Sequence, residues 1–159
     1  MSVEIRPAER KDVPLVLDFI KKLAVYERLS EECVATEELL ERYLFGEEKV
    51  AGSLLAYEDG SPVGFALYFF SFSTFLAKPG IYLEDLFVLK EKRGRGYGKA
   101  LLKYLAALAV EKDYGRLEWA VLDWNKLSID FYDSLGARSM NEWITYRLEG
   151  ESLESVASG

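Results

Sequence analysis

Arg93-Gly94-Arg95-Gly96-Tyr97-Gly98-Lys99 joins an apolar run, residues 81–89, to a helix predicted over residues 98–112. Glycines at such a strand-to-helix junction let backbone N–H groups approach an anion, and the helix dipole adds partial positive charge. A Rossmann fingerprint would need glycine where Lys99 stands, and a P-loop would need glycine where Arg93 stands. The segment therefore predicts a phosphate site of another kind, with a tight turn that binds nothing as the simpler alternative.

Hydrophobic periodicity and turn residues on either side of this junction predict a mixed α/β chain. Strands are expected at residues 3–6, 53–57, 63–72, 81–89, 117–122 and 143–148, and helices from Asp12 to Ala24 and at residues 36–45, 98–112 and 127–135. Asp12 and Thr36 are the expected caps of the first two helices, and Asp59-Gly60 is the expected hairpin turn. Strands and helices do not alternate strictly, so the expectation is one mixed central sheet with helices on both faces. Residues 1–148 are expected to form a single domain, followed by a flexible tail at residues 149–159.

Composition narrows the possible functions. The chain has 159 residues and a formal net charge of −7, which argues against nucleic acid and favours a small cationic partner. Cys33 is the only cysteine and histidine is absent, so we expect a reducing, cytoplasmic location and neither a His-based triad nor a His-ligated metal. Residues 1–10 lack the apolar core of a signal peptide, and residues 60–77 read as a strand and not as a membrane span.

Two motifs carry a family resemblance. Arg-x-x-Gly-x-Gly at residues 93–98, after Tyr82-Leu83-Glu84-Asp85-Leu86-Phe87-Val88, resembles the acetyl-CoA-binding motif of the GNAT superfamily of N-acetyltransferases. Residues 125–136 are similar to its second signature, N-x-x-(S/A)-x-x-(F/L)-Y-x-x-x-G. Across residues 3–148, stretches such as Ile129-Asp130-Phe131-Tyr132 resemble the spermidine/spermine (diamine) and thialysine N-acetyltransferase group, and the likeness weakens after Gly136.

This resemblance implies the GNAT-type acyl-CoA N-acyltransferase fold, acetyl-CoA as acetyl donor and a homodimer, with the aromatic-rich final strand a candidate contact. Loop amides would hold the diphosphate, and the backbone of the preceding strand would pair with the pantetheine arm. The cofactor residues implied are Leu86, Phe87, Val88, Arg93, Gly94, Arg95, Gly96, Tyr97, Gly98, Lys99, Asn125 and Ser128. Asn125 is also a candidate cap for the helix that follows it.

Acetyl transfer to an alkyl ammonium needs a proton acceptor, because such a group has a pKa of about 10.4. Glu84 and Asp85 are neighbours on a predicted strand, so strict alternation would put them on opposite faces, and a desolvated carboxylate suits proton acceptance. The resemblance implies that Glu84 is the catalytic residue on the substrate side. The alternative is a carboxylate at a strand bulge, satisfied by backbone or by Arg93. The other residues expected to line the amine site are Tyr26, Glu27, Asp85, Glu118 and Trp119.

The thiolate of coenzyme A benefits from a proton donor as it leaves, and Tyr132 matches the tyrosine that does this in the family. Taken alone, an aromatic residue on a short helix is more often a packing residue. The sequence therefore predicts direct acetyl transfer to a primary amine of a polyamine, a diamine or a thialysine-like amino acid, with no metal. Acetylation of a protein lysine or N-terminus, and a non-catalytic acyl-CoA sensor, are the alternatives.

Overall fold

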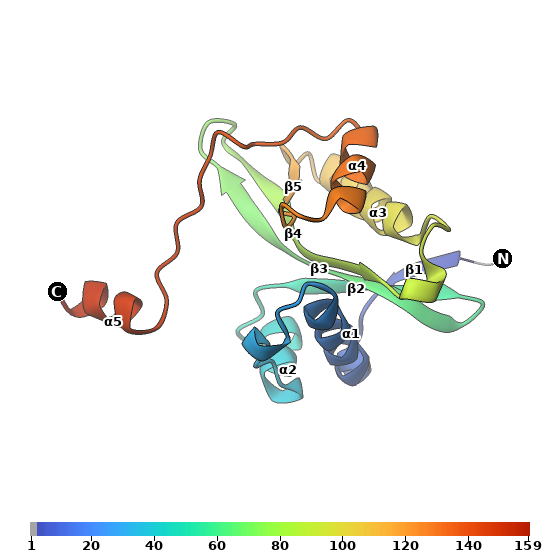
Figure 1. Cartoon of the computed structure of the whole chain (residues 1–159), viewed down its shortest axis with the longest axis horizontal. Coiled ribbons are helices and arrows are strands. Elements are labelled where there is room, and N and C mark those ends of the chain that lie inside the picture. The colour runs from blue at the N-terminus through green and yellow to red at the C-terminus, as the bar shows by residue number, and fades with distance from the viewer. Residues whose placement is uncertain (1–2) are drawn as a thin grey trace. The chain divides into compact units, whose positions relative to one another are not determined.

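A computed structural model describes residues 3–159, which fall into two compact units, the first ending at Leu122 and the second spanning Asp123–Gly159. The first unit contains a five-stranded mixed sheet in the order β1-β2-β3-β4-β5 (Figure 1). The strands are β1 (Val3–Pro7), β2 (Gly52–Glu58), β3 (Ser61–Ser73), β4 (Lys78–Val88) and β5 (Leu117–Trp119). Neighbours from β1 to β4 pair antiparallel, whereas β4 and β5 pair in parallel. The predicted mixed sheet is confirmed.

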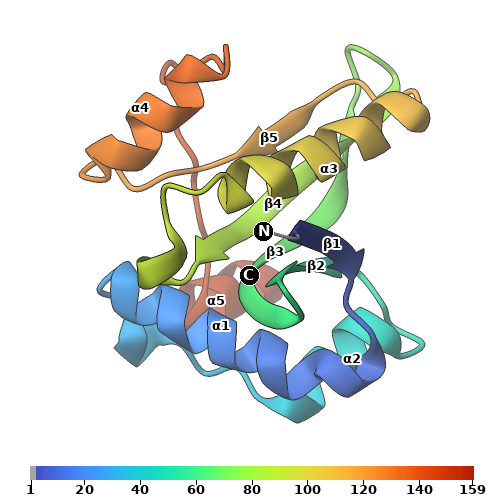
Figure 2. The ribbon, with the colours of Figure 1, turned by 90° about the vertical axis from the view of Figure 1, so that its right-hand side faces the viewer.

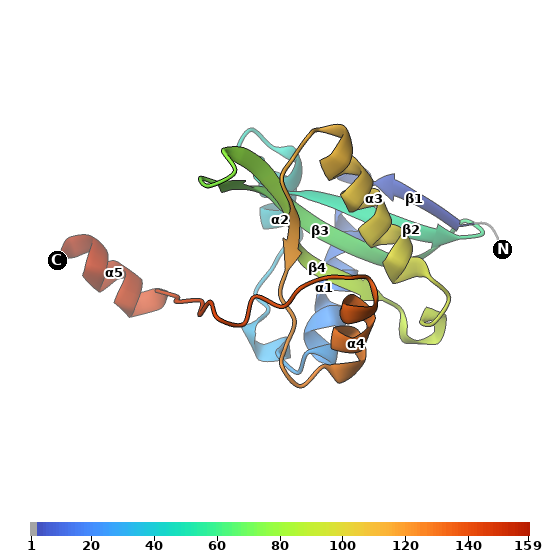
Figure 3. The ribbon, with the colours of Figure 1, turned by 90° about the horizontal axis from the view of Figure 1, so that it is seen from above.

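Helices cover both faces of this sheet. Helices α1 (Val13–Tyr26) and α2 (Glu37–Phe45) lie on one face, and α3 (Tyr97–Glu111) lies on the other (Figure 2). Figure 3 shows α3 running along the face formed by β1 to β4. On the α1 side, Phe19 stacks on Phe65 with ring centroids 5.6 Å apart, at the centre of a buried cluster that includes Phe87. Stacked aromatic pairs of this kind add about 0.5–1.5 kcal/mol beyond area burial.

Most of the predicted boundaries hold to within a few residues because their signals are local. Asp59 and Gly60 both have positive φ angles and close the two-residue turn between β2 and β3, as such pairs do in hairpins. The Thr36 hydroxyl accepts from the Leu39 amide at 3.2 Å and caps α2. Asp12 does not cap α1 with its side chain, contrary to expectation, because its carboxylate accepts from the Glu9 amide instead.

The second unit departs from the prediction. It contains α4 (Lys126–Ser134) and α5 (Gly150–Ser158), joined by a stretch without regular secondary structure. The strand predicted at residues 143–148 is wrong for this structure, because within residues 3–159 no strand pairs with it. Most of residues 149–159 is helical, and the flexible tail predicted there stays a prediction. The single domain predicted over residues 1–148 stays a prediction.

No helix in residues 3–159 is long and apolar enough to cross a membrane. Over the same residues, no group of three or more His, Cys, Asp or Glu side chains is arranged to hold a metal ion.

Candidate active site

The glycine-rich loop presents its backbone amides. Gly94 and Gly96 have φ angles of +78° and +89°, a conformation that other residues adopt only at a cost, whereas Gly98 lies within the first turn of α3. Within residues 3–159, no amide from residue 94 to residue 99 donates to a backbone carbonyl. Because these N–H groups converge at the N-terminus of a helix, the loop is suited to an anion such as a diphosphate.

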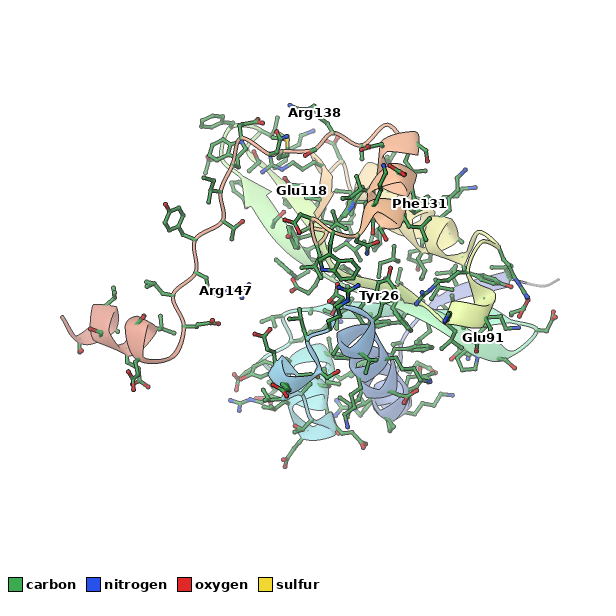
Figure 4. The ribbon with its side chains drawn as sticks, in the orientation of Figure 1. Tyr26, Glu91, Glu118, Phe131, Arg138 and Arg147 are labelled. Carbon is green, nitrogen blue, oxygen red and sulfur yellow. The ribbon has the colours of Figure 1, made fainter. Side chains whose placement is uncertain are left out.

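Arg93 contacts two aromatic rings and a backbone carbonyl. Its guanidinium carbon lies 4.5 Å from the ring centroid of Tyr26 and 5.3 Å from that of Phe87. Its Nε donates to the Val88 carbonyl at 2.9 Å. The arginine therefore connects the loop with the end of α1, where Figure 4 shows Tyr26. Cation–π contacts at exposed positions are worth about 0.5–1 kcal/mol each.

The far edge of β4 lacks a neighbouring strand where the resemblance puts the pantetheine arm. Strand β5 pairs with β4 only at Ile81, Tyr82 and Leu83. Among residues 3–159, the edge of β4 opposite β3 has no strand partner from Glu84 to Val88. An edge of this kind exposes N–H and C=O groups that can pair with an extended amide-containing chain.

A β-bulge interrupts β4 at the predicted carboxylates. Leu67 pairs with Asp85 and Tyr68 pairs with Leu83, so Glu84 is an extra residue without a partner on β3. The bulge named above as the alternative is therefore present, and it interrupts the strict alternation that the expectation of opposite faces assumed. Instead, both carboxylates are close enough to Glu27, the C-cap of α1, for their charges to interact. Arg93 donates to the Val88 carbonyl through Nε and, within residues 3–159, forms no ion pair with Glu84.

The three carboxylates differ in exposure, and the pKa values of Asp85 and Glu27 are raised. Glu84 is exposed, whereas Asp85 and Glu27 are half-buried. Burial, followed by the charges of Glu84 and Glu27, raises the pKa of Asp85 to about 7. Burial and the charge of Glu84 also raise the pKa of Glu27. The cluster is therefore negative and holds a carboxyl group that exchanges its proton near neutral pH, which suits it to an ammonium.

The remaining residues predicted for the amine site flank this cluster. The rings of Tyr26 and Phe87 meet edge to face, with their centroids 6.4 Å apart. Glu118 is paired with Tyr82 in the sheet register and forms an ion pair with Arg116 at 3.0 Å, and its charge contributes to the raised pKa of Tyr82. Trp119 is half-buried and is the register partner of Leu83. Tyr26, Glu27, Glu84, Asp85 and Glu118 are thus gathered around β4, and Trp119 is its neighbour on β5.

The second signature motif lies in the other unit. The Asn125 side chain is buried and accepts from the Ser128 amide at 3.2 Å, which caps α4 as the alternative for this residue predicted. Tyr132 is half-buried on α4, with its ring centroid 5.5 Å from that of Phe131. The predicted site residues Asn125, Ser128 and Tyr132 are close in sequence and belong to one unit, Asp123–Gly159.

Sequence reasoning missed one ionic group beside the loop. Glu58, at the end of β2, is buried and pairs with Lys92 and Arg95. Basic residues at 92 and 95 were visible in the sequence, but nothing near Glu58 in the sequence indicated their partner.

Comparison with known proteins identifies the class. Residues 21–137 match the model of the acetyltransferase (GNAT) family, so the chain belongs to this family. It is accordingly an N-acetyltransferase, and acetyl-CoA is the acetyl donor that the family uses in general.

Relatives resemble it over nearly its whole length. A thialysine N-epsilon-acetyltransferase of Sus scrofa is 40% identical over 98% of this chain and 98% of its own length. An L-ornithine N5-acetyltransferase of Arabidopsis thaliana is 33% identical over 98% of this chain and 88% of its own length. Among solved structures, an integron cassette protein from the mobile metagenome of V. cholerae is 33% identical, with a TM-score of 0.82, over 100% of this chain and 99% of that one.

Proposed function

We propose that this protein transfers acetyl from acetyl-CoA directly to a primary amine of a small cationic substrate, a polyamine, a diamine or a thialysine-like amino acid. One observation carries the proposal. A single strand, β4, leads from the carboxylate cluster at Glu84 and Asp85 to the loop of unpaired amides at residues 94–99. A cation-binding group and an anion-binding group thus adjoin the same strand, as transfer between an ammonium and a coenzyme A thioester requires.

The donor is proposed to bind along β4 and its loop. In this proposal the amides of Gly94, Arg95, Gly96, Tyr97, Gly98 and Lys99 hold the diphosphate, with the charges of Arg93, Arg95 and Lys99 nearby. The backbone edge of Leu86, Phe87 and Val88 pairs with the pantetheine arm. Asn125 and Ser128 are proposed as further cofactor contacts. The left-handed glycines and the missing strand neighbour support this assignment.

The acceptor is proposed to enter at the carboxylate cluster. Glu84, the most exposed of the three carboxylates, takes the ammonium proton directly or through water, and Asp85 and Glu27 attract the cation. The amine nitrogen then attacks the thioester carbonyl, and the C–S bond breaks as the tetrahedral intermediate collapses. Tyr132 is proposed to donate a proton to the departing thiolate and to recover one, directly or through water, as the nitrogen loses its second proton, which gives coenzyme A and the acetylated amine. Tyr26, Glu118 and Trp119 are proposed to line this amine site.

Substrate charge is the property that the site discriminates best. Three carboxylates within Coulomb range favour an acceptor with more than one positive charge. An amino acid acceptor brings a carboxylate of its own, yet the named relatives include thialysine and ornithine acetyltransferases. Both classes of small amine therefore stay within the proposal.

A thiol-release assay tests the proposed function. Spermidine, putrescine, thialysine, lysine and a histone-like peptide are compared at equal concentration with acetyl-CoA as donor. We expect turnover with at least one of the small amines and none with the peptide. Turnover with the peptide alone would overturn the proposal in favour of a protein acetyltransferase.

A homodimer in the cytoplasm is proposed on separate grounds. Residues 143–148 leave Trp143 75% exposed and Tyr146 91% exposed, and such apolar surface is often covered by a second copy. The cytoplasmic location rests on the single cysteine. Sedimentation of the purified chain tests the dimer, and a monomer at micromolar concentration would contradict it.

A further inference from the structure

Glu58 is a buried carboxylate that the proposed reaction does not use. It is the last residue of β2, and only 7% of it is exposed, which makes it the one fully buried charged residue found in residues 3–159. Burying a carboxylate is costly unless cations and hydrogen-bond donors compensate its charge. The groups that compensate this charge therefore show which segments of the chain Glu58 connects.

All the partners of Glu58 come from the segment that leads into α3. The Lys92 ammonium binds Oε2, and Arg95 Nη1 donates to Oε1 at 3.2 Å. The Tyr97 hydroxyl is fully buried and makes no hydrogen bond of ordinary geometry, but it lies close enough to Glu58 to influence its pKa. The three partners are spread across the glycine-rich loop and the residues just before it.

The carboxylate stays charged at any working pH. The hydrogen bond from Lys92, the nearby Tyr97 hydroxyl and the charges of Lys92 and Arg95 together lower the pKa of Glu58 to about 2, against the opposing effect of its burial. The pairs join residues 34 and 37 positions apart in the chain. Glu58 thus connects the β2–β3 hairpin to a loop in which, within the described residues 3–159, the amides of residues 94–99 donate to no backbone carbonyl.

We infer that Glu58 is a positioning residue for the acyl donor, which holds the loop at residues 93–99 in its amide-presenting shape through Lys92 and Arg95. Glycines at 94 and 96 leave the loop backbone with many accessible conformations, so an external anchor is needed to select one. Glu58 acts through its partners, because both of its oxygens already accept from cations. This inference rests on the proposed function, since the loop is useful only if it binds coenzyme A.

Glu58→Gln is the first test, with the dissociation constant of coenzyme A measured by calorimetry and steady-state kinetics measured on the full chain. We expect the dissociation constant and the KM for acetyl-CoA to rise about tenfold, as for the loss of one interaction with a charged group. We expect kcat at saturating acetyl-CoA and the KM for the amine to change less than about twofold. A general loss of structure would lower kcat as well, so the split between KM and kcat distinguishes the two.

Lys92→Gln supplies a second test that does not depend on how Glu58→Gln folds. If Lys92 acts through Glu58, Lys92→Gln also raises the KM for acetyl-CoA. In the variant with both substitutions, the fold increase in this KM is then smaller than the product of the two single fold increases. Glu48→Gln is the matched control, because it removes an exposed ion pair with Arg42, near the end of α2. We expect this control to bind coenzyme A like the parent protein.

Three outcomes separate the inference from the proposed function. Parent protein that does not bind coenzyme A would overturn the proposed function itself. Parent protein that binds, with both variants binding equally well, would overturn the role of Glu58 alone. Tighter binding by Glu58→Gln would also overturn it, since the carboxylate would then be competing with the ligand for Lys92 and Arg95.

Discussion

Asp85→Asn should stabilise the folded protein at high pH even as it damages the proposed active site. The pKa of Asp85 is about 7 in the folded protein, because burial and two neighbouring carboxylates disfavour the charged form. In the unfolded chain it takes its ordinary value of 3.8. The folded state therefore binds more protons than the unfolded state between these values, and the stability of the parent protein falls as pH rises from about 4 to about 7. Below pH 3.8 the folded protein does not bear this cost.

The size of the effect follows from the displaced pKa. One pKa step corresponds to about 1.4 kcal/mol, so the charged carboxylate costs roughly 2–4 kcal/mol above pH 7, the lower figure allowing for water beside the exposed Glu84. An asparagine at this position is uncharged at both pH 4 and pH 8, so it does not bear this cost. We expect its stability advantage to be roughly 2–4 kcal/mol larger at pH 8 than at pH 4, or about 6–12 °C in Tm for a chain of this size.

Denaturant unfolding at pH 4, 6 and 8 measures this difference, with Glu48→Gln as a control whose charge is exposed. The reasoning is refuted if the free-energy difference between Asp85→Asn and the parent protein is the same at all three pH values. It is equally refuted if the variant is the less stable protein at pH 8.

Further predictions concern the donor side. Adding acetyl-CoA should raise Tm, and Arg93→Glu should abolish the rise, because a ligand bound only by the folded state stabilises it; a thermal-shift assay with no rise in the parent protein would remove the donor assignment. Tyr132→Phe should lower kcat and leave the affinity for acetyl-CoA unchanged by calorimetry, and unchanged turnover would exclude Tyr132 as the proton donor. Gly96→Ala should destabilise the chain by about 1–2 kcal/mol in urea, because its φ is +89°, whereas Gly98→Ala should not; equal losses would contradict the strain argument.

Local signals made most of the first unit predictable. The Asp59–Gly60 turn, the Thr36 cap and the strand-loop-helix order around residues 81–112 all depend on residues close together in sequence. The likeness to the GNAT family then supplied the fold and the candidate site. The family match over residues 21–137 confirms that likeness.

The features that escaped prediction depend on contacts between distant residues. Sequence reasoning named a bulge at Glu84 only as an alternative, because its pairing with β3 is needed to establish it. Glu58 meets Lys92 and Arg95 only after the sheet forms. The segment at residues 143–148 alternates like a strand, but a strand needs a partner, and among residues 3–159 none pairs with it.

A crystal structure with bound coenzyme A tests the central claim most directly. The distances to be measured are those from the diphosphate oxygens to the amide nitrogens of residues 94–99. We predict several of about 3 Å, with the pantetheine arm against the open edge of β4. A diphosphate bound elsewhere, with those amides facing water or blocked by side chains, would contradict the account.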